Sequence, residues 1–242
     1  MGRYAAGIAA VLFCAAATAA ERPDFTGVWT NAGGPGIGGA TNTGAAAAPP
    51  YTPAAKARID AYQKLFGGTD DSPGKWCVGT GMPGSMLGSG GYPMEIIQRP
   101  EQITVIYEAH AEIRRIYLGD RNAKQEDRVP GRNGYSSGRW EGDTLVVETD
   151  NLVDQLDQRT PHSEEATIVE RYKLEPAKDA QGRRVLTAEM TMTDPKFYTK
   201  PLTIKKSWAE VPNGRVLPYE CPEEAWLDRQ AEVARKAGVP AP

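Results

Sequence analysis

Apolar and polar residues alternate along most of the chain after Met94, and this period of two predicts β-strands. Turn signals such as Gly142-Asp143 and Pro195 separate most of the runs. The sequence between the runs has no helical pattern of useful length, so the predicted pairing is antiparallel. The runs are Met94–Arg99, Ile103–Ala109, Glu112–Leu118, Tyr135–Trp140, Thr144–Asn151, Ala166–Glu175, Arg184–Thr193 and Leu202–Val211.

A further strand and two helices are predicted outside this region. Pro23–Thr30 has the composition of a first strand. Thr52 is the expected N-cap of a helix at Pro53–Phe66, which a Gly-Gly pair ends. Pro222–Lys236 predicts a C-terminal helix with acidic residues in its first turn. Residues 31–91 are otherwise rich in Gly, Ala and Pro, which predicts loops around the first helix.

The predicted fold is mainly β and occupies residues 21–242 as a single domain. Strands in sequence order favour an antiparallel up-and-down barrel of the lipocalin or calycin type, or a strongly curled sheet. One helix is expected before the barrel and one at its C-terminal side. A β-sandwich is the alternative. Gly27-Val28-Trp29 is typical of the start of lipocalin-like barrels.

Residues 1–20 have the pattern of a signal peptide. Arg3 provides a positive start, Ala5–Phe13 an apolar centre, and Ala17-Thr18-Ala19 a small-residue cleavage site. The apolar centre is too short to span a bilayer. The sequence therefore predicts a protein that is exported to the periplasm and has no stable membrane insertion.

The cysteine content agrees with export. After removal of Cys14 with the signal peptide, Cys77 and Cys221 remain, and two thiols in an oxidising compartment most simply form a disulfide. Two buried free thiols are the alternative.

Charge and motifs exclude several classes of function. The formal net charge is −3, and loss of Arg3 makes it one unit more negative, which argues against nucleic-acid binding. The chain has no Cys/His cluster with metal-ligand spacing, no nucleophile-elbow motif and no Walker loop. The glycine-rich stretches lack the strand-then-helix context of a dinucleotide site. We therefore expect no cofactor and no metal.

Two acidic residues fall on apolar strand faces. Glu170 shares a face with Ile168, Tyr172 and Leu174, and Asp194 follows a face made by Leu186, Ala188, Met190 and Met192. A buried charge needs a partner, so we expect these carboxylates to meet Arg114, Arg115 or Arg171, or else to titrate unusually. Structural ion pairs near the barrel ends are one interpretation. A polar patch inside a ligand cavity is the other.

His162 is the central candidate for proton transfer, because histidine titrates near neutral pH and only two are present. It could act as a general base beside a carboxylate, or it could be a turn histidine bonded to its neighbours. The predicted catalytic residues are His162, Asp194 and Glu170, with Arg115 and Tyr117 holding an oxyanion or phenolate. The predicted substrate-binding residues are Arg115, Tyr117, Tyr172, Tyr198 and Trp140.

From Pro93 onward the chain resembles a large, mostly uncharacterised family of exported bacterial proteins. The resemblance rests on long stretches that include EIRRIYLGD, GRWEGDTLVVET and PHSEEATIVERY, and it covers about three fifths of the chain. It implies a β-rich exported protein without naming an activity. The recurrent stretches contain His162, Glu170, Arg171, Asp194, Tyr198, Arg115 and Tyr117.

Three functions follow from these patterns. The first is a cofactor-independent lyase or isomerase that uses acid–base chemistry on a small aromatic or apolar molecule in a barrel cavity. The alternative is an exported lipocalin-like protein that binds a small ligand without catalysis. The second alternative is an envelope interaction module. The pattern leaves the oligomeric state open.

Overall fold

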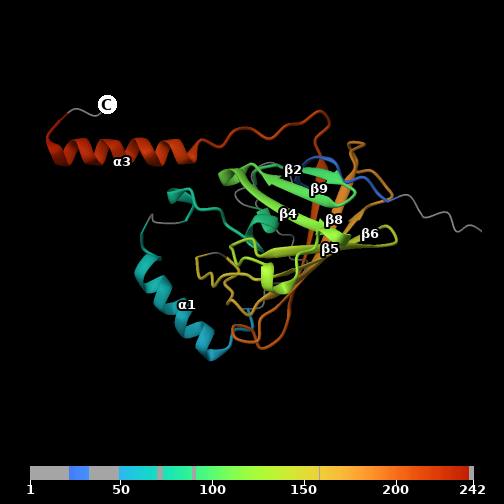
Figure 1. Cartoon of the computed structure of the whole chain (residues 1–242), viewed down its shortest axis with the longest axis horizontal. Coiled ribbons are helices and arrows are strands. Elements are labelled where there is room, and N and C mark those ends of the chain that lie inside the picture. Colours follow the sequence, from blue (N-terminus) through green and yellow to red (C-terminus); the bar gives the residue numbers. More distant parts are fainter. Residues whose placement is uncertain (1–21, 33–48, 70–72, 89–90, 158, 240–242) are drawn as a thin grey trace, which may run out of the picture.

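The chain forms a closed barrel of nine strands that neighbour one another in sequence order (Figure 1). The computed structural model describes residues 22–32, 49–69, 73–88, 91–157 and 159–239, without the side chains of residues 221–226. The mainly β prediction, with a helix before the barrel and one at the C-terminus, is confirmed. The strands are β1 Gly27–Asn31, β2 Met94–Arg99, β3 Gln102–Tyr107, β4 Glu112–Leu118, β5 Tyr135–Glu141, β6 Thr144–Asp150, β7 Thr167–Leu174, β8 Val185–Thr193 and β9 Leu202–Glu210.

One strand pair departs from the antiparallel prediction. The ladder between β4 and β5 is parallel and joins Ile116 with Ser136, Tyr117 with Ser137 and Leu118 with Gly138. The crossover of residues 119–134 contains two short 3-10 helices, η3 Gly119–Arg121 and η4 Gln125–Asp127. It returns the chain to the end of the barrel where β4 began. The first half of β4 therefore has no ladder partner in β5.

The strand alternation places the core as predicted. Ile168, Leu186, Met190 and Met192 are fully buried inside the barrel, together with Trp29 of β1. On β4 the inward face carries Arg114, Ile116 and Leu118, whereas the outward face carries Ile113, Arg115 and Tyr117. The barrel interior therefore contains one guanidinium on this strand, and two further polar side chains of β4 point outward.

Helix α1, Pro53–Phe66, begins where the sequence predicted. Thr52 accepts a hydrogen bond at its Oγ1 from the Ala55 N–H, at 3.1 Å, and Pro53 occupies the first turn. Ala55 is its one fully buried residue, and Phe66 remains 40 % exposed. The helix therefore packs only partly against the hydrophobic core.

Helix α3, Cys221–Ala237, projects away from the barrel and ends at Gly238, which adopts a left-handed φ of 69° (Figure 1). Among the described residues, no helix combines the length and the apolar character that crossing a membrane requires.

The segment that follows α1 contributes side chains to the core. It contains the 3-10 helix η1, Gly74–Trp76, and the short helix α2, Gly84–Gly88. We call residues 79–88 the Met82 loop, because Met82 and Met86 are fully buried in the hydrophobic core. The loop thus contributes two methionine side chains to the hydrophobic core.

Candidate functional site

A fully buried ion pair crosses the barrel interior. The Arg114 guanidinium on β4 donates to Glu170 on β7 through both terminal nitrogens, with Nη1 at 3.0 Å from Oε1. Its remaining donors reach Ser136 Oγ at 3.0 Å and Thr149 Oγ1 at 2.8 Å. The Tyr172 hydroxyl donates to Glu170 Oε1 at 2.7 Å. The prediction that Glu170 meets an arginine is confirmed, and its carboxylate is fully engaged.

The electrostatics of the pair fix the protonation states of Arg114 and Tyr172. Burial opposes the charge of Arg114, but the adjacent Glu170 carboxylate outweighs that effect and raises the guanidinium pKa. Burial also raises the pKa of the Tyr172 hydroxyl, and the negative charge of Glu170 raises it further. Arg114 therefore stays charged and Tyr172 stays protonated throughout the physiological pH range.

Lys206 of β9 also lies inside the barrel, and sequence reasoning missed it. It is 2 % exposed, and its Nζ donates to the Leu87 carbonyl oxygen at 3.1 Å. In the β-ladders, Lys206 pairs with Ala188 of β8, and Ala188 pairs with Tyr172 of β7. Burial lowers the pKa of Lys206 to about 8. The alternation of Ile204, Lys206 and Trp208 was the signal that could have revealed it.

Replacement of Lys206 by Met should raise the free energy of unfolding by about 1–3 kcal/mol at neutral pH, because it removes a desolvated charge. In the folded protein the pKa of Lys206 is about 8, whereas the ordinary value is 10.5. Between these two pH values, the unfolded chain therefore binds more protons than the folded chain. The wild-type protein therefore gains stability as the pH rises through this range, and the advantage of Lys206→Met shrinks.

Urea denaturation from about pH 7 to about pH 10 measures this difference. Lys205→Met is the matched control, because Lys205 is an exposed neighbour and should show almost no effect. The prediction is contradicted if the free energy of unfolding of Lys206→Met exceeds that of the wild-type protein by the same amount at all pH values.

Asp194 and His162 lie in a different part of the fold. Asp194 is buried and accepts hydrogen bonds from the Ser163 N–H at 2.7 Å, the Ser163 hydroxyl at 2.8 Å and the Phe197 N–H at 3.0 Å. It contacts a turn, whereas the prediction paired it with an arginine. Backbone N–H groups can supply the hydrogen bonds that a buried carboxylate needs, so no guanidinium is required at Asp194.

His162 contacts backbone carbonyl groups through both ring nitrogens. Nδ1 lies 3.0 Å from the Ser163 oxygen and Nε2 lies 3.0 Å from the Met82 oxygen. The ring is fully buried. His162 therefore connects the strand-entry turn of β7 with the Met82 loop, and both nitrogens are occupied by protein groups.

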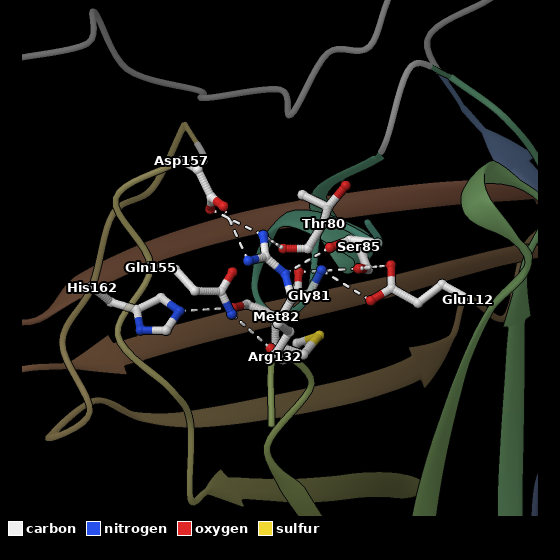
Figure 2. A network of polar contacts seen from close by, with 10 residues as sticks. Thr80, Gly81, Met82, Ser85, Glu112, Arg132, Gln155, Asp157 and His162 are labelled. Atoms are coloured by element: carbon white, nitrogen blue, oxygen red, sulfur yellow. Dashed lines mark hydrogen bonds and ion pairs between the residues drawn. The ribbon is translucent and has the colours of Figure 1, made fainter. Parts of the chain in front are cut away.

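Polar contacts anchor the Met82 loop on its other side (Figure 2). Glu112 accepts hydrogen bonds from the Gly81 N–H at 2.9 Å and from the Ser85 hydroxyl at 2.6 Å. Arg132 donates to the Gly79 carbonyl oxygen at 2.7 Å. At Gly81, φ is 73° and a Cβ atom would lie 2.5 Å from the Arg132 oxygen, so the close approach requires glycine. These hydrogen bonds hold the Met82 loop against β4 and against the crossover.

A surface cavity of about 460 Å³ opens at the seam between β4 and β5, and we call it the seam cavity. Arg114 and Ser136 of the interior cluster form part of its lining, so it reaches the barrel wall where the ladder is missing. Its lining is Ile113, Arg114, Arg115, Tyr117, Arg121, Ala123, Asp127, Val129, Asn133, Gly134, Tyr135 and Ser136.

The seam cavity combines cationic and aromatic groups. The guanidinium groups of Arg115 and Arg121 make no hydrogen bond or ion pair with any residue in the described ranges. Tyr117 stacks on Tyr135 with ring centroids 5.1 Å apart. Arg128, which is outside the lining, covers the Tyr135 ring at 4.5 Å, and the lining also contains the Asp127 carboxylate. This lining can hold an anion against an aromatic surface.

The predicted site residues fall into separate places. Glu170 and Tyr172 share the barrel interior, whereas Arg115 and Tyr117 border the seam cavity from outside. Sequence reasoning did not identify Arg121, because the crossover that brings it to the cavity has no sequence signature. The remaining predicted residues lie elsewhere in the fold: His162, Asp194, Tyr198 and Trp140.

Comparisons of the chain with protein-family models, with curated proteins and with solved structures found no match.

Proposed function

We propose that the protein binds a small organic anion with an aromatic or apolar body in the seam cavity. The observation that carries this proposal is the presence of two guanidinium groups, Arg115 and Arg121, that border one cavity and have no partner among the described residues. Guanidinium groups form strong, often bidentate hydrogen bonds with carboxylates.

The rest of the lining suits the apolar part of such a ligand. The Tyr117 ring, the 45 % exposed Ile113 and the 80 % exposed Val129 border the same cavity. Its volume of about 460 Å³ falls within the usual range for small-molecule sites. By contrast, His162 and Asp194 direct their polar atoms to protein groups away from this cavity. These contacts favour binding over the acid–base roles expected for those two residues.

Titration calorimetry with benzoate and benzamide tests the proposal. We expect benzoate to bind more tightly than its neutral analogue, and more weakly as salt is added. Arg115→Ala should weaken benzoate binding by about tenfold or more, because it removes a charge-assisted hydrogen bond. Arg171→Ala, which removes an exposed guanidinium paired with Glu141, is the control and should leave binding unchanged. Equal affinity for benzoate and benzamide would overturn the proposal.

The acid–base enzyme expected from the sequence is the second candidate. It draws on the buried Lys206, whose amine has a pKa of about 8 and lies beside Trp208, with Nζ 5.9 Å from the ring centroid. A lyase or isomerase would convert members of a pool of small aromatic molecules, and mass spectrometry of the incubated pool would detect the product. Recovery of every pool member unaltered counts against this candidate.

We also propose that the protein acts after export to the periplasm, with residues 1–20 removed and Cys77 joined to Cys221. The signal-peptide pattern supports export, and the side chain of Cys221 lies outside the described residues. The intact mass of the mature protein should show loss of the signal peptide, and reduction should then add the mass of two hydrogen atoms. A mature protein that alkylates on both cysteines without reduction would contradict the disulfide.

A further inference from the structure

We propose that the ligand of the seam cavity extends past Arg121 into a second cavity beside Trp140, and that this second cavity holds an uncharged, apolar part of the ligand. The ligand class is then an elongated carboxylate. Its anionic group lies at Arg115 and Arg121, and its body includes at least one further ring or an equivalent aliphatic chain. This inference rests on the proposed function and narrows its ligand class.

The second cavity has a volume of about 430 Å³ and lies at the barrel end where β4 finishes, so we call it the rim cavity. Its walls come from the last residue of β4, from η3 directly after it, from Gly138–Trp140 of β5 and from the turn between β2 and β3. The parallel ladder pairs the end of β4 with β5 at Gly138. The rim cavity is therefore a product of the same strand pairing as the seam cavity.

The two cavities adjoin each other. Arg121, whose side chain is exposed, belongs to the lining of both. On β4, Tyr117 lines the seam cavity and the next residue, Leu118, lines the rim cavity. Consecutive residues of a strand are about 3.3 Å apart, so the boundary is short compared with an aromatic ligand. A single ligand anchored at Arg121 can therefore occupy both cavities.

The charges of the rim cavity disfavour a second anionic group there. Its lining contains Arg22 and Arg139, but also the carboxylates of Glu101 and Asp120. Arg139 is already paired with two glutamates. An anion in this cavity would lie near two like charges, which opposes binding. The cationic groups without a partner that the seam cavity offers are not matched here, so the part of the ligand in the rim cavity is uncharged.

The apolar surface of the rim cavity centres on Trp140. This side chain is partly exposed, and its ring packs on Phe25 with centroids 5.3 Å apart, which holds it in place. Pro100 and Leu118 line the same cavity. At Gly119, where φ is 54°, a Cβ atom would meet nothing within 4 Å, so the turn leaves room beside it. An indole ring in such a position offers a large contact surface to a second aromatic ring.

Titration calorimetry with benzoate and biphenyl-4-carboxylate gives the first test. We expect the biphenyl compound to bind about tenfold more tightly or better, because its second ring leaves water for the rim cavity. In Trp140→Ala the ratio of the two affinities should fall to about threefold or less. Trp76→Ala is the matched control, because Trp76 is 63 % exposed and lies outside both linings, and it should keep the wild-type ratio.

Bromine quenches tryptophan fluorescence on contact and gives a second test that does not depend on affinity. Trp140 is the one tryptophan that lines either of these two cavities within the described part of the chain. We expect 4′-bromobiphenyl-4-carboxylate to quench the wild-type protein and Trp76→Phe, whereas 4-bromobenzoate quenches much less. In Trp140→Phe, which keeps an aromatic ring at this position, the quenching by the long compound should disappear.

The outcomes separate the two proposals. Equal affinities for benzoate and biphenyl-4-carboxylate, or quenching by the long compound that survives Trp140→Phe, overturn the extension into the rim cavity and leave the anion site intact. Equal quenching by 4-bromobenzoate also overturns it, because the short ligand would then lie beside Trp140 already. If Trp140→Ala does not fold, Trp140→Phe still decides the question by fluorescence. Failure of all these carboxylates to bind overturns the proposed function itself.

Discussion

Glu170→Gln should lower the free energy of unfolding by about 3–5 kcal/mol, because it leaves the Arg114 guanidinium charged and unpaired in the barrel interior. Arg114 is 1 % exposed and Glu170 is 0 % exposed, so water cannot replace the lost partner. The adjacent carboxylate raises the guanidinium pKa, and the variant removes that stabilisation of the charge. Urea denaturation at neutral pH, with fluorescence from the five tryptophans, measures the change.

A double replacement tests the origin of the effect. Arg114→Met combined with Glu170→Met removes both charges and should be less destabilising than Glu170→Gln, because no buried charge is left alone. Tyr172→Phe removes one donor to Glu170 and should cost about 1–3 kcal/mol. If the double variant is no more stable than the single one, the loss comes from packing and the charge argument fails.

Asp194→Ala should lower the free energy of unfolding by about 3 kcal/mol or more without weakening benzoate binding at the seam cavity. The carboxylate accepts hydrogen bonds from Ser163 and from the N–H groups of Lys196 and Phe197, and hydrogen bonds to charged groups stabilise by about 1.5–3 kcal/mol each. Its removal leaves buried N–H donors unsatisfied. The measurement combines urea denaturation with titration of the folded variant.

Ser163→Ala provides the graded comparison for Asp194, because it removes one side-chain donor and keeps the carboxylate with its backbone partners. Its expected cost is about 1 kcal/mol. A stable Asp194→Ala protein that loses turnover of an identified substrate would assign Asp194 to catalysis and contradict its structural role.

Local sequence patterns predicted the elements well, because they depend on neighbouring residues. The run Ala166–Glu175 corresponds to β7 at Thr167–Leu174, and the expected C-terminal helix corresponds to α3 at Cys221–Ala237. The same alternation correctly placed Glu170 on a buried face and required an arginine beside it. Alternation also marked Lys206, whose inward position was overlooked.

The arrangement of the candidate site depended on contacts between distant segments. Arg115 and Arg121 meet at one cavity because the crossover of residues 119–134 makes β4 and β5 parallel. Backbone N–H groups of the turn at Lys196 and Phe197 took the place of the arginine expected for Asp194.

The sequence by itself therefore determined the strand faces, the two longer helices and the burial of one charge that needed a partner. Periodicity and helix capping are local properties, so they can be read without knowing the fold. The tertiary structure alone decided the parallel seam, the cavity beside it and the groups left unpaired there. Those features depend on how the barrel closes and on strand register, which bring together side chains that lie far apart in the chain.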